Sequence, residues 1–161
     1  MRSVALVLCT LTTLLFASFA LAVPAAQAGG ARMDSGERAV LRGINRARAF
    51  HGLRRLRADR RLARAADAHT RNMLRADFFA HGAFAQRVRR YIRVPVRAVG
   101  ETLAYTSRCS ARTVVRMWLN SPSHRAVLLS RSFRRVGIGR RRGRLGATRA
   151  CLVTADFASR R

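Results

Sequence analysis

The chain has 161 residues, of which 33 are basic and only 7 are acidic, so its formal charge is +26. Every basic residue is arginine, and the hydrophobic fraction of 49% excludes a disordered basic tail, because such tails hold too few apolar residues to form a core. We expect one domain of ordinary size whose surface attracts anionic partners such as nucleic acid, acidic glycopolymers or membrane headgroups.

The first 28 residues have the pattern of a secretory signal peptide. Arg2 precedes an apolar run from Val4 to Val23, and the small-residue triplet that ends at Ala28 offers a cleavage site. An uncleaved membrane anchor is the alternative, but the cleavage motifs and Pro24 favour removal. We therefore expect a secreted, extracytoplasmic protein with no stable membrane span after cleavage and no specific nucleic-acid partner.

Two cysteines remain after the signal peptide takes Cys9 with it. Cys109 and Cys151 are an even number in an oxidising compartment, which favours a disulfide between them. Two unpaired buried thiols are the alternative. A metal site is disfavoured, because neither cysteine belongs to a CxxC motif.

The first half of the mature chain predicts two amphipathic helices. Residues 29–36 are small and polar, as in a linker, and apolar residues then recur with helical spacing from Glu37 to about His51. A second helix starts after the expected N-cap Asp59 and ends near Arg75.

The second half predicts shorter elements. These are a helix at about 84–91, a strand at 96–105 interrupted at Gly100-Glu101, a helix capped by Ser110, and a helix from Pro122 to about Leu129 with Ser121 as its cap. Two further strands, Val136–Gly139 and Cys151–Phe157, are expected to be joined by Arg140–Gly146 as a hairpin connection. Helices followed by a hairpin favour an α+β domain with an antiparallel sheet.

Few residues could carry chemistry. Glu101 lies in an apolar strand, where a carboxylate must be paired, and the alternatives are a functional site or a structural salt bridge to an arginine. His81 and His124 each lie beside apolar anchors and are candidate ligands or acid–base groups, whereas His51 and His69 fit surface or packing positions.

The segments resemble bacterial members of the CAP superfamily, also called SCP-like extracellular domains after the cysteine-rich secretory, antigen 5 and pathogenesis-related 1 proteins. The resemblance covers about residues 37–158 and leaves 159–161 as a tail. It is carried, in order, by Ile44–Arg48, Phe78–His81, Gly100–Ala104, Trp118–Arg125, Val136–Gly139 and Thr154–Phe157.

The resemblance implies a three-layer α-β-α sandwich with a small antiparallel sheet and a central cleft. Carried over by motif, His81, Glu101 and His124 match three of the four cleft positions, which in family members can hold zinc or another divalent metal. The fourth position departs, because Ser121 stands where eukaryotic relatives have a glutamate. No residue is therefore assigned as catalytic.

Three functions follow in order of preference. The first is a secreted, monomeric binding module whose cleft takes a lipid, peptide or cell-wall ligand. The second is a metal-assisted hydrolase of peptide or wall polymer, which the missing fourth acid disfavours. The third is a cationic surface protein that binds anionic cell-surface polymers, although arginines scattered along the whole chain count against a single groove.

Overall fold

A computed structural model describes residues 33–160 of the chain. Its elements are α1 (Ser35–Phe50), β1 (Arg57–Ala58), α2 (Arg60–Arg75), α3 (Phe84–Ile92), β2 (Val99–Thr106), α4 (Ala111–Asn120), α5 (Pro122–Leu128), β3 (Arg135–Leu145) and β4 (Thr148–Ala158). The expected signal peptide, with Cys9 and the cleavage point after Ala28, lies outside the described residues. Within residues 33–160, no helix has both the length and the apolar character needed to cross a membrane.

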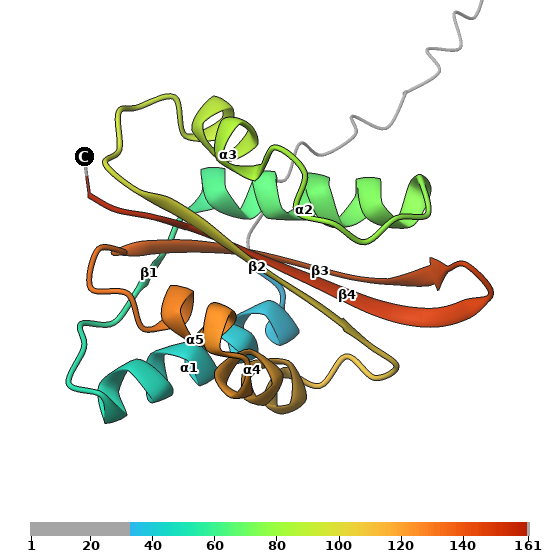
Figure 1. The fold of residues 1–161 in the computed structure, drawn as a ribbon, viewed down its shortest axis with the longest axis horizontal. Helices are drawn as coiled ribbons and strands as arrows, with labels where there is room; N and C mark the ends of the chain where they lie inside the picture. The colour runs from blue at the N-terminus through green and yellow to red at the C-terminus, as the bar shows by residue number, and fades with distance from the viewer. Residues whose placement is uncertain (1–32, 161) are drawn as a thin grey trace, which may run out of the picture.

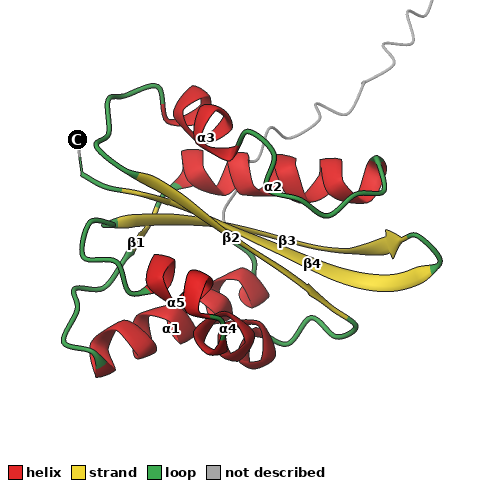
Figure 2. Ribbon diagram, viewed as in Figure 1, coloured by secondary structure: helices red, strands yellow, loops and turns green. Residues whose placement is uncertain are grey.

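The elements form the three-layer α-β-α sandwich that the sequence predicts. Helices α2 and α3 cover one face of the sheet, and α1, α4 and α5 cover the other (Figures 1 and 2). The strand order is β1-β3-β4-β2, with β1 parallel to β3 and the other pairs antiparallel. Strand β2 is therefore an edge strand of the sheet, with one helical layer on each side of it (Figure 1).

Side-chain caps set the starts of the long helices. Asp34 accepts a hydrogen bond from the backbone N–H of Glu37, whose carboxylate accepts one from the N–H of Asp34, so α1 begins with a capping box. This cap starts α1 at Ser35, inside the segment expected to be a linker. Asp59 and Ser110 cap α2 and α4 as the sequence predicts.

The expectation of a long arginine-rich connection between the last two strands is wrong. Strands β3 and β4 continue through the arginines and pair as far as Leu145 with Thr148, which leaves a tight turn at Gly146. Successive side chains of a strand point to opposite faces. Arg140 accordingly pairs with Asp34 of the α1 layer at 3.0 Å, and Arg141 pairs with Asp67 of α2 at 2.7 Å, so the arginines fasten the strand to both layers.

Two smaller expectations also change. Strand β2 starts at Val99, three residues later than expected, and runs through Gly100 and Glu101 without a break. Ser159, placed in a tail by the sequence, is buried, and its hydroxyl accepts hydrogen bonds from the backbone N–H groups of Arg97 and Ala98.

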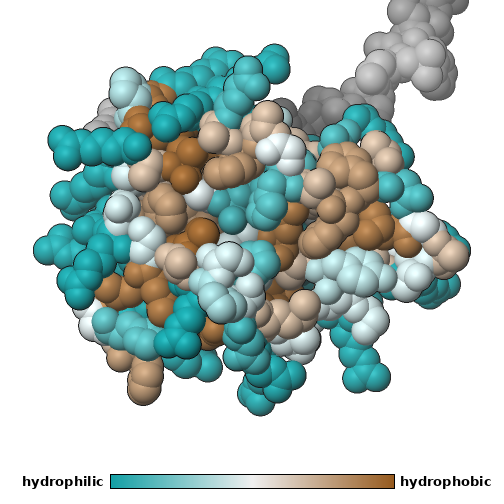
Figure 3. Space-filling model, in the orientation of Figure 1, coloured by the Kyte–Doolittle hydropathy of each residue, from teal (hydrophilic) through white to brown (hydrophobic). Residues whose placement is uncertain are grey.

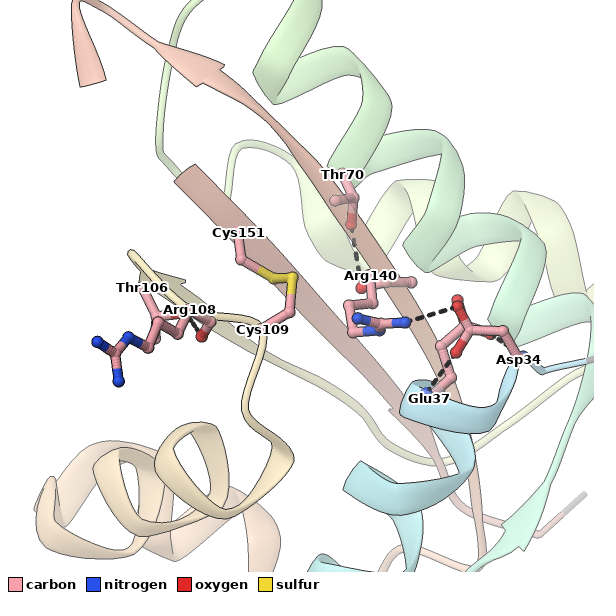
Figure 4. The surroundings of a disulfide bond; sticks show 9 residues. Asp34, Glu37, Thr70, Thr106, Arg108, Cys109, Arg140 and Cys151 are labelled. Atoms are coloured by element: carbon pink, nitrogen blue, oxygen red, sulfur yellow. Dashed lines mark hydrogen bonds and ion pairs between the residues drawn. A yellow bond between two sulfur atoms is a disulfide. The ribbon is translucent and has the colours of Figure 1, made fainter. Parts of the chain in front are cut away.

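The disulfide expected from the cysteine count is present. Cys109, in the loop before α4, is bonded to Cys151 of β4, with 5.3 Å between their Cα atoms (Figure 4). The crosslink closes a loop of 42 residues, which in a chain-entropy model is worth about 4 kcal/mol. It fixes the loop after the edge strand to the centre of the sheet.

Helix α2 lies unusually close to β3 because two glycines remove the side chains between them. A Cβ atom added at Gly137 would lie 1.9 Å from the backbone nitrogen of Ala63, and one at Gly139 would lie 2.4 Å from that of Asp67. The two backbones are thus in direct contact, and Thr70 of α2 donates a hydrogen bond across the contact to the hydroxyl of Thr154 at 2.8 Å.

We expect Gly137→Ala to lower the free energy of unfolding by at least about 3 kcal/mol, because the added methyl group collides with helix backbone that cannot move alone. Gly143→Ala in the same strand is the matched control, since its Cβ would meet only the side chain of Leu74, at 2.9 Å. That variant should lose about 1 kcal/mol or less. Urea unfolding of both measures the difference, and equal losses would contradict the backbone contact.

Candidate functional site

The three candidate residues are drawn from both helical layers and the edge of the sheet. Glu101 belongs to β2, His81 lies in the loop between α2 and α3, and His124 lies in the first turn of α5. In Figure 1, β2 passes in front of the other strands, and Figure 3, from the same side, shows polar residues around the rim and exposed apolar residues toward the middle.

The carboxylate of Glu101 is engaged at both oxygens. Oε1 is 2.7 Å from Nδ1 of His81, and Oε2 pairs with the guanidinium of Arg87. The Glu101 side chain is 0% exposed, whereas that of His81 is 47% exposed. Glu101 therefore takes part in the candidate cleft and in an arginine salt bridge at once, and it holds His81 with its other ring nitrogen free to face outward.

Asp156 is a cleft residue that the sequence analysis did not assign. It lies directly opposite Glu101 in the β2–β4 register, so the two carboxyl groups share the face of the sheet covered by α2. Neither oxygen of Asp156 receives a hydrogen bond within residues 33–160, and its nearest cation is Arg87, at 3.9 Å. The sequence signal was present, since an aspartate in a strand of apolar residues must be compensated.

The environment favours the protonated form of Asp156. Burial raises the pKa of this carboxyl well above its usual range, and the neighbouring Glu101 raises it further, while Arg87 only partly opposes both effects. Arg87 is thus shared by two buried acids. A proton on Asp156 reduces the repulsion between the two carboxyl groups.

His69 positions the loop that carries His81. This histidine is buried on α2, which is the packing position that the sequence left open beside a surface one, and its Nε2 donates a hydrogen bond to the carbonyl oxygen of Ala80 at 2.9 Å. Burial lowers the pKa of His69, and the charge on Arg87 lowers it further, so the imidazole is neutral at pH 7. His69 is therefore a positioning residue immediately behind the cleft.

His124 is held by the residue that replaces the fourth acid. Nδ1 of His124 lies 2.9 Å from the hydroxyl oxygen of Ser121, and that hydroxyl makes no capping bond to α5. Burial lowers the pKa of His124, and the proximity of His81 lowers it further. A neutral His124 with one nitrogen bound to Ser121 leaves Nε2 for a ligand.

These residues do not fit a metal ion as they are arranged. Residues 33–160 contain no group of three histidine, cysteine or acidic side chains placed to hold one. Both oxygens of Glu101 are occupied, and Arg87 already supplies positive charge beside them. The zinc or other divalent ion suggested by the resemblance thus stays a prediction that this donor geometry does not favour.

Solved structures place the fold among SCP-like domains. An extracellular protein containing an SCP domain from Bacillus anthracis is 25% identical with a TM-score of 0.66, over 78% of this chain and 40% of that one. An outer surface protein of Borrelia burgdorferi is 24% identical with a TM-score of 0.65, over 82% of this chain and 99% of that one. A more distant structure of the same fold, NaASP2, at 11% identity and a TM-score of 0.57, contains Zn²⁺.

The sequence assigns the family. Residues 41–154 match the model described as CAP, the cysteine-rich secretory protein family, and the chain belongs to that family. It is also 31% identical over 108 residues to the uncharacterized membrane protein YlbC of Bacillus subtilis. That match covers 64% of this chain but only 31% of YlbC, so the chain corresponds to about a third of this relative.

The buried acid pair predicts a pH-dependent stability. Because the pKa of Asp156 is raised in the folded state, unfolding releases its proton once the pH exceeds the ordinary value of 3.8, and stability falls as the pH rises toward the folded-state pKa. The slope from this group is at most about 1.4 kcal/mol per pH unit. Asp156→Asn should abolish this contribution, so its stability relative to the parent should grow with pH.

Chemical unfolding at a series of pH values from 4 upward measures this difference. Asp77→Asn, which removes an exposed carboxyl, controls for the loss of one negative charge. A constant offset between Asp156→Asn and the parent at all pH values would show that Asp156 does not hold a proton in the folded protein.

Proposed function

We propose that this protein is an extracytoplasmic binding module whose cleft of His81, Glu101 and His124 recognises a peptide or cell-wall fragment by hydrogen bonding. The observation that carries the proposal is the engagement of both Glu101 oxygens. One carboxylate oxygen orients His81 and the other pairs with Arg87, so the ligand meets the free imidazole nitrogens rather than the acid.

The same observation favours binding over hydrolysis. A general base must be unprotonated and within reach of the substrate. Glu101 is fully buried and paired, Asp156 is fully buried with a raised pKa, and Ser121 stands at the fourth position in place of an acid. The described part of the cleft thus offers two imidazoles that can take part in hydrogen bonds, but no free carboxylate.

Among the ligands that the sequence left open, a peptide or wall fragment suits this cleft better than a lipid. Imidazole nitrogens and the Ser121 hydroxyl recognise amide and hydroxyl groups, which peptides and wall sugars carry in series. The Cys109–Cys151 disulfide supports an oxidising location outside the cytoplasm, as do the pattern of residues 1–28 and the extracellular and outer-surface relatives.

Soluble muropeptides test the proposal. We expect them to bind the parent protein and to bind His81→Gln and His124→Gln at least about tenfold more weakly, because each variant loses a hydrogen-bonding partner worth about 1.4 kcal/mol. His51→Gln, at the exposed end of α1, is the matched control and should bind as the parent does. Isothermal titration calorimetry measures all four affinities, and unchanged binding in both cleft variants would refute the proposal.

Zinc titration tests the alternative of a metal centre. Because Arg87 and His81 occupy Glu101, we expect zinc to bind the parent protein no more tightly than the double variant His81→Gln/His124→Gln. Calorimetry after chelator treatment measures this. One-to-one zinc binding by the parent that the double variant loses would favour the metal-assisted hydrolase instead.

A further inference from the structure

A groove of about 1060 Å³ lies between α2 and α3, beside the cleft but on the outer side of these helices. Among its lining residues are six arginines and no aspartate or glutamate. The arginines are Arg61, Arg64 and Arg75 from α2, Arg87 and Arg90 from α3, and Arg93 at the end of α3. We call this feature the α2–α3 groove. Arginines also line other hollows of the described residues, so they are not gathered in this groove alone.

Half of these arginines have no partner within the described part of the chain. Arg61 donates to the carbonyl oxygen of Ile92, Arg75 to the side chain of Asn72, and Arg87 to Glu101. The side chains of Arg64, Arg90 and Arg93 make no hydrogen bond or ion pair among residues 33–160. All three are exposed. Their guanidinium groups are therefore available to a ligand.

The acids that could neutralise the groove are held elsewhere. Asp34, Asp59 and Asp67 each pair with an arginine of β3, at 3.0, 2.8 and 2.7 Å. Helix α3 has no acidic residue of its own. No acidic residue lines the groove, so the charges of its exposed arginines are not compensated there.

The length and chemistry of the groove select a chain with repeated anionic groups. From Arg61 to Arg75 the helix rises about 21 Å, which is longer than any single phosphate. A guanidinium binds a phosphate oxygen pair in a fixed fork, so a row of them suits successive phosphates. Single-stranded nucleic acid is disfavoured because base recognition needs exposed aromatic faces. Phe78 and Tyr91, the groove's aromatic residues, are half-buried, and Phe78 packs edge-on against His69.

We propose that the α2–α3 groove binds a flexible, base-free phosphodiester polymer, such as a polyol-phosphate glycopolymer of a cell wall. The groove is a second site, beside the imidazole cleft and distinct from it. Arg87 connects the two, since it lines the groove and also pairs with Glu101.

A fluorescent oligo(glycerol phosphate) long enough to cover α2 tests the proposal on the full chain with its disulfide formed. We expect Arg64→Gln/Arg90→Gln/Arg93→Gln to bind it about tenfold more weakly or worse, with the salt dependence of log K reduced by about 2 for three lost phosphate contacts. The matched control is Arg108→Gln/Arg131→Gln/Arg149→Gln, which removes the same charge from exposed positions that line neither this groove nor the other arginine-lined hollows. Fluorescence anisotropy at several salt concentrations should show less than about threefold weakening for this control.

Three outcomes would overturn the proposal. Equal losses in the two triple variants would show attraction to overall charge alone. Equal affinity for polyglutamate would remove the preference for phosphate. Tighter, groove-dependent binding of oligo(dT) would assign the groove to nucleic acid. Circular dichroism confirms folding of each variant, and the groove variant should keep its muropeptide affinity, so failure of this site is distinguishable from failure of the cleft.

Discussion

The direct contact between the backbones of α2 and β3 sets the position of everything that surrounds the cleft. With glycine at 137 and 139, the helix settles onto the strand without intervening side chains. Thr70 can then reach Thr154 in the central strand, and His69, on the same side of α2, reaches the carbonyl oxygen of Ala80. A helix held even one side chain farther away would carry the loop with His81 away from Glu101, and the cleft would lose its orienting hydrogen bond.

The second constraint is electrostatic and follows from the scarcity of acids. Two of the seven acidic residues, Glu101 and Asp156, face each other across neighbouring strands in the interior. Two buried carboxylates with one guanidinium between them would leave an uncompensated charge, which costs several kcal/mol. The raised pKa of Asp156 favours its neutral form, which avoids that charge. The carboxylate of Glu101 is committed to Arg87 and His81 rather than to chemistry.

Local signals predicted the helices and the disulfide well, because helical spacing, capping residues and cysteine count act over short distances or by composition. The residues alone indicated an α+β domain and singled out His81, Glu101 and His124, and the resemblance, in which motif order was decisive, added the sandwich and the common cleft. What failed depended on pairing between distant segments. Residues Arg140–Gly146 were expected to be a connection, because their pairing with β4 and with acids of both layers is not visible in the sequence. Asp156 was not assigned, because its position opposite Glu101 depends on the register of β2 and β4. A single sequence does not show which residues of two distant strands pair with each other.

The arginines that are in excess over the acids have several different structural roles. Some arginines link segments of the interior: Arg48 is fully buried and donates hydrogen bonds to the carbonyl oxygens of Arg54, Leu128 and Ser130. Other arginines, on β3, form ion pairs with three of the seven acidic residues. Because these acids are paired with β3, they do not neutralise the exposed arginines of α2 and α3. Three of the acid–arginine pairs are thus made by one strand, β3. An anion in the groove would lie near Arg87 and compete with Glu101 for its guanidinium, so occupancy of one site would be felt at the other.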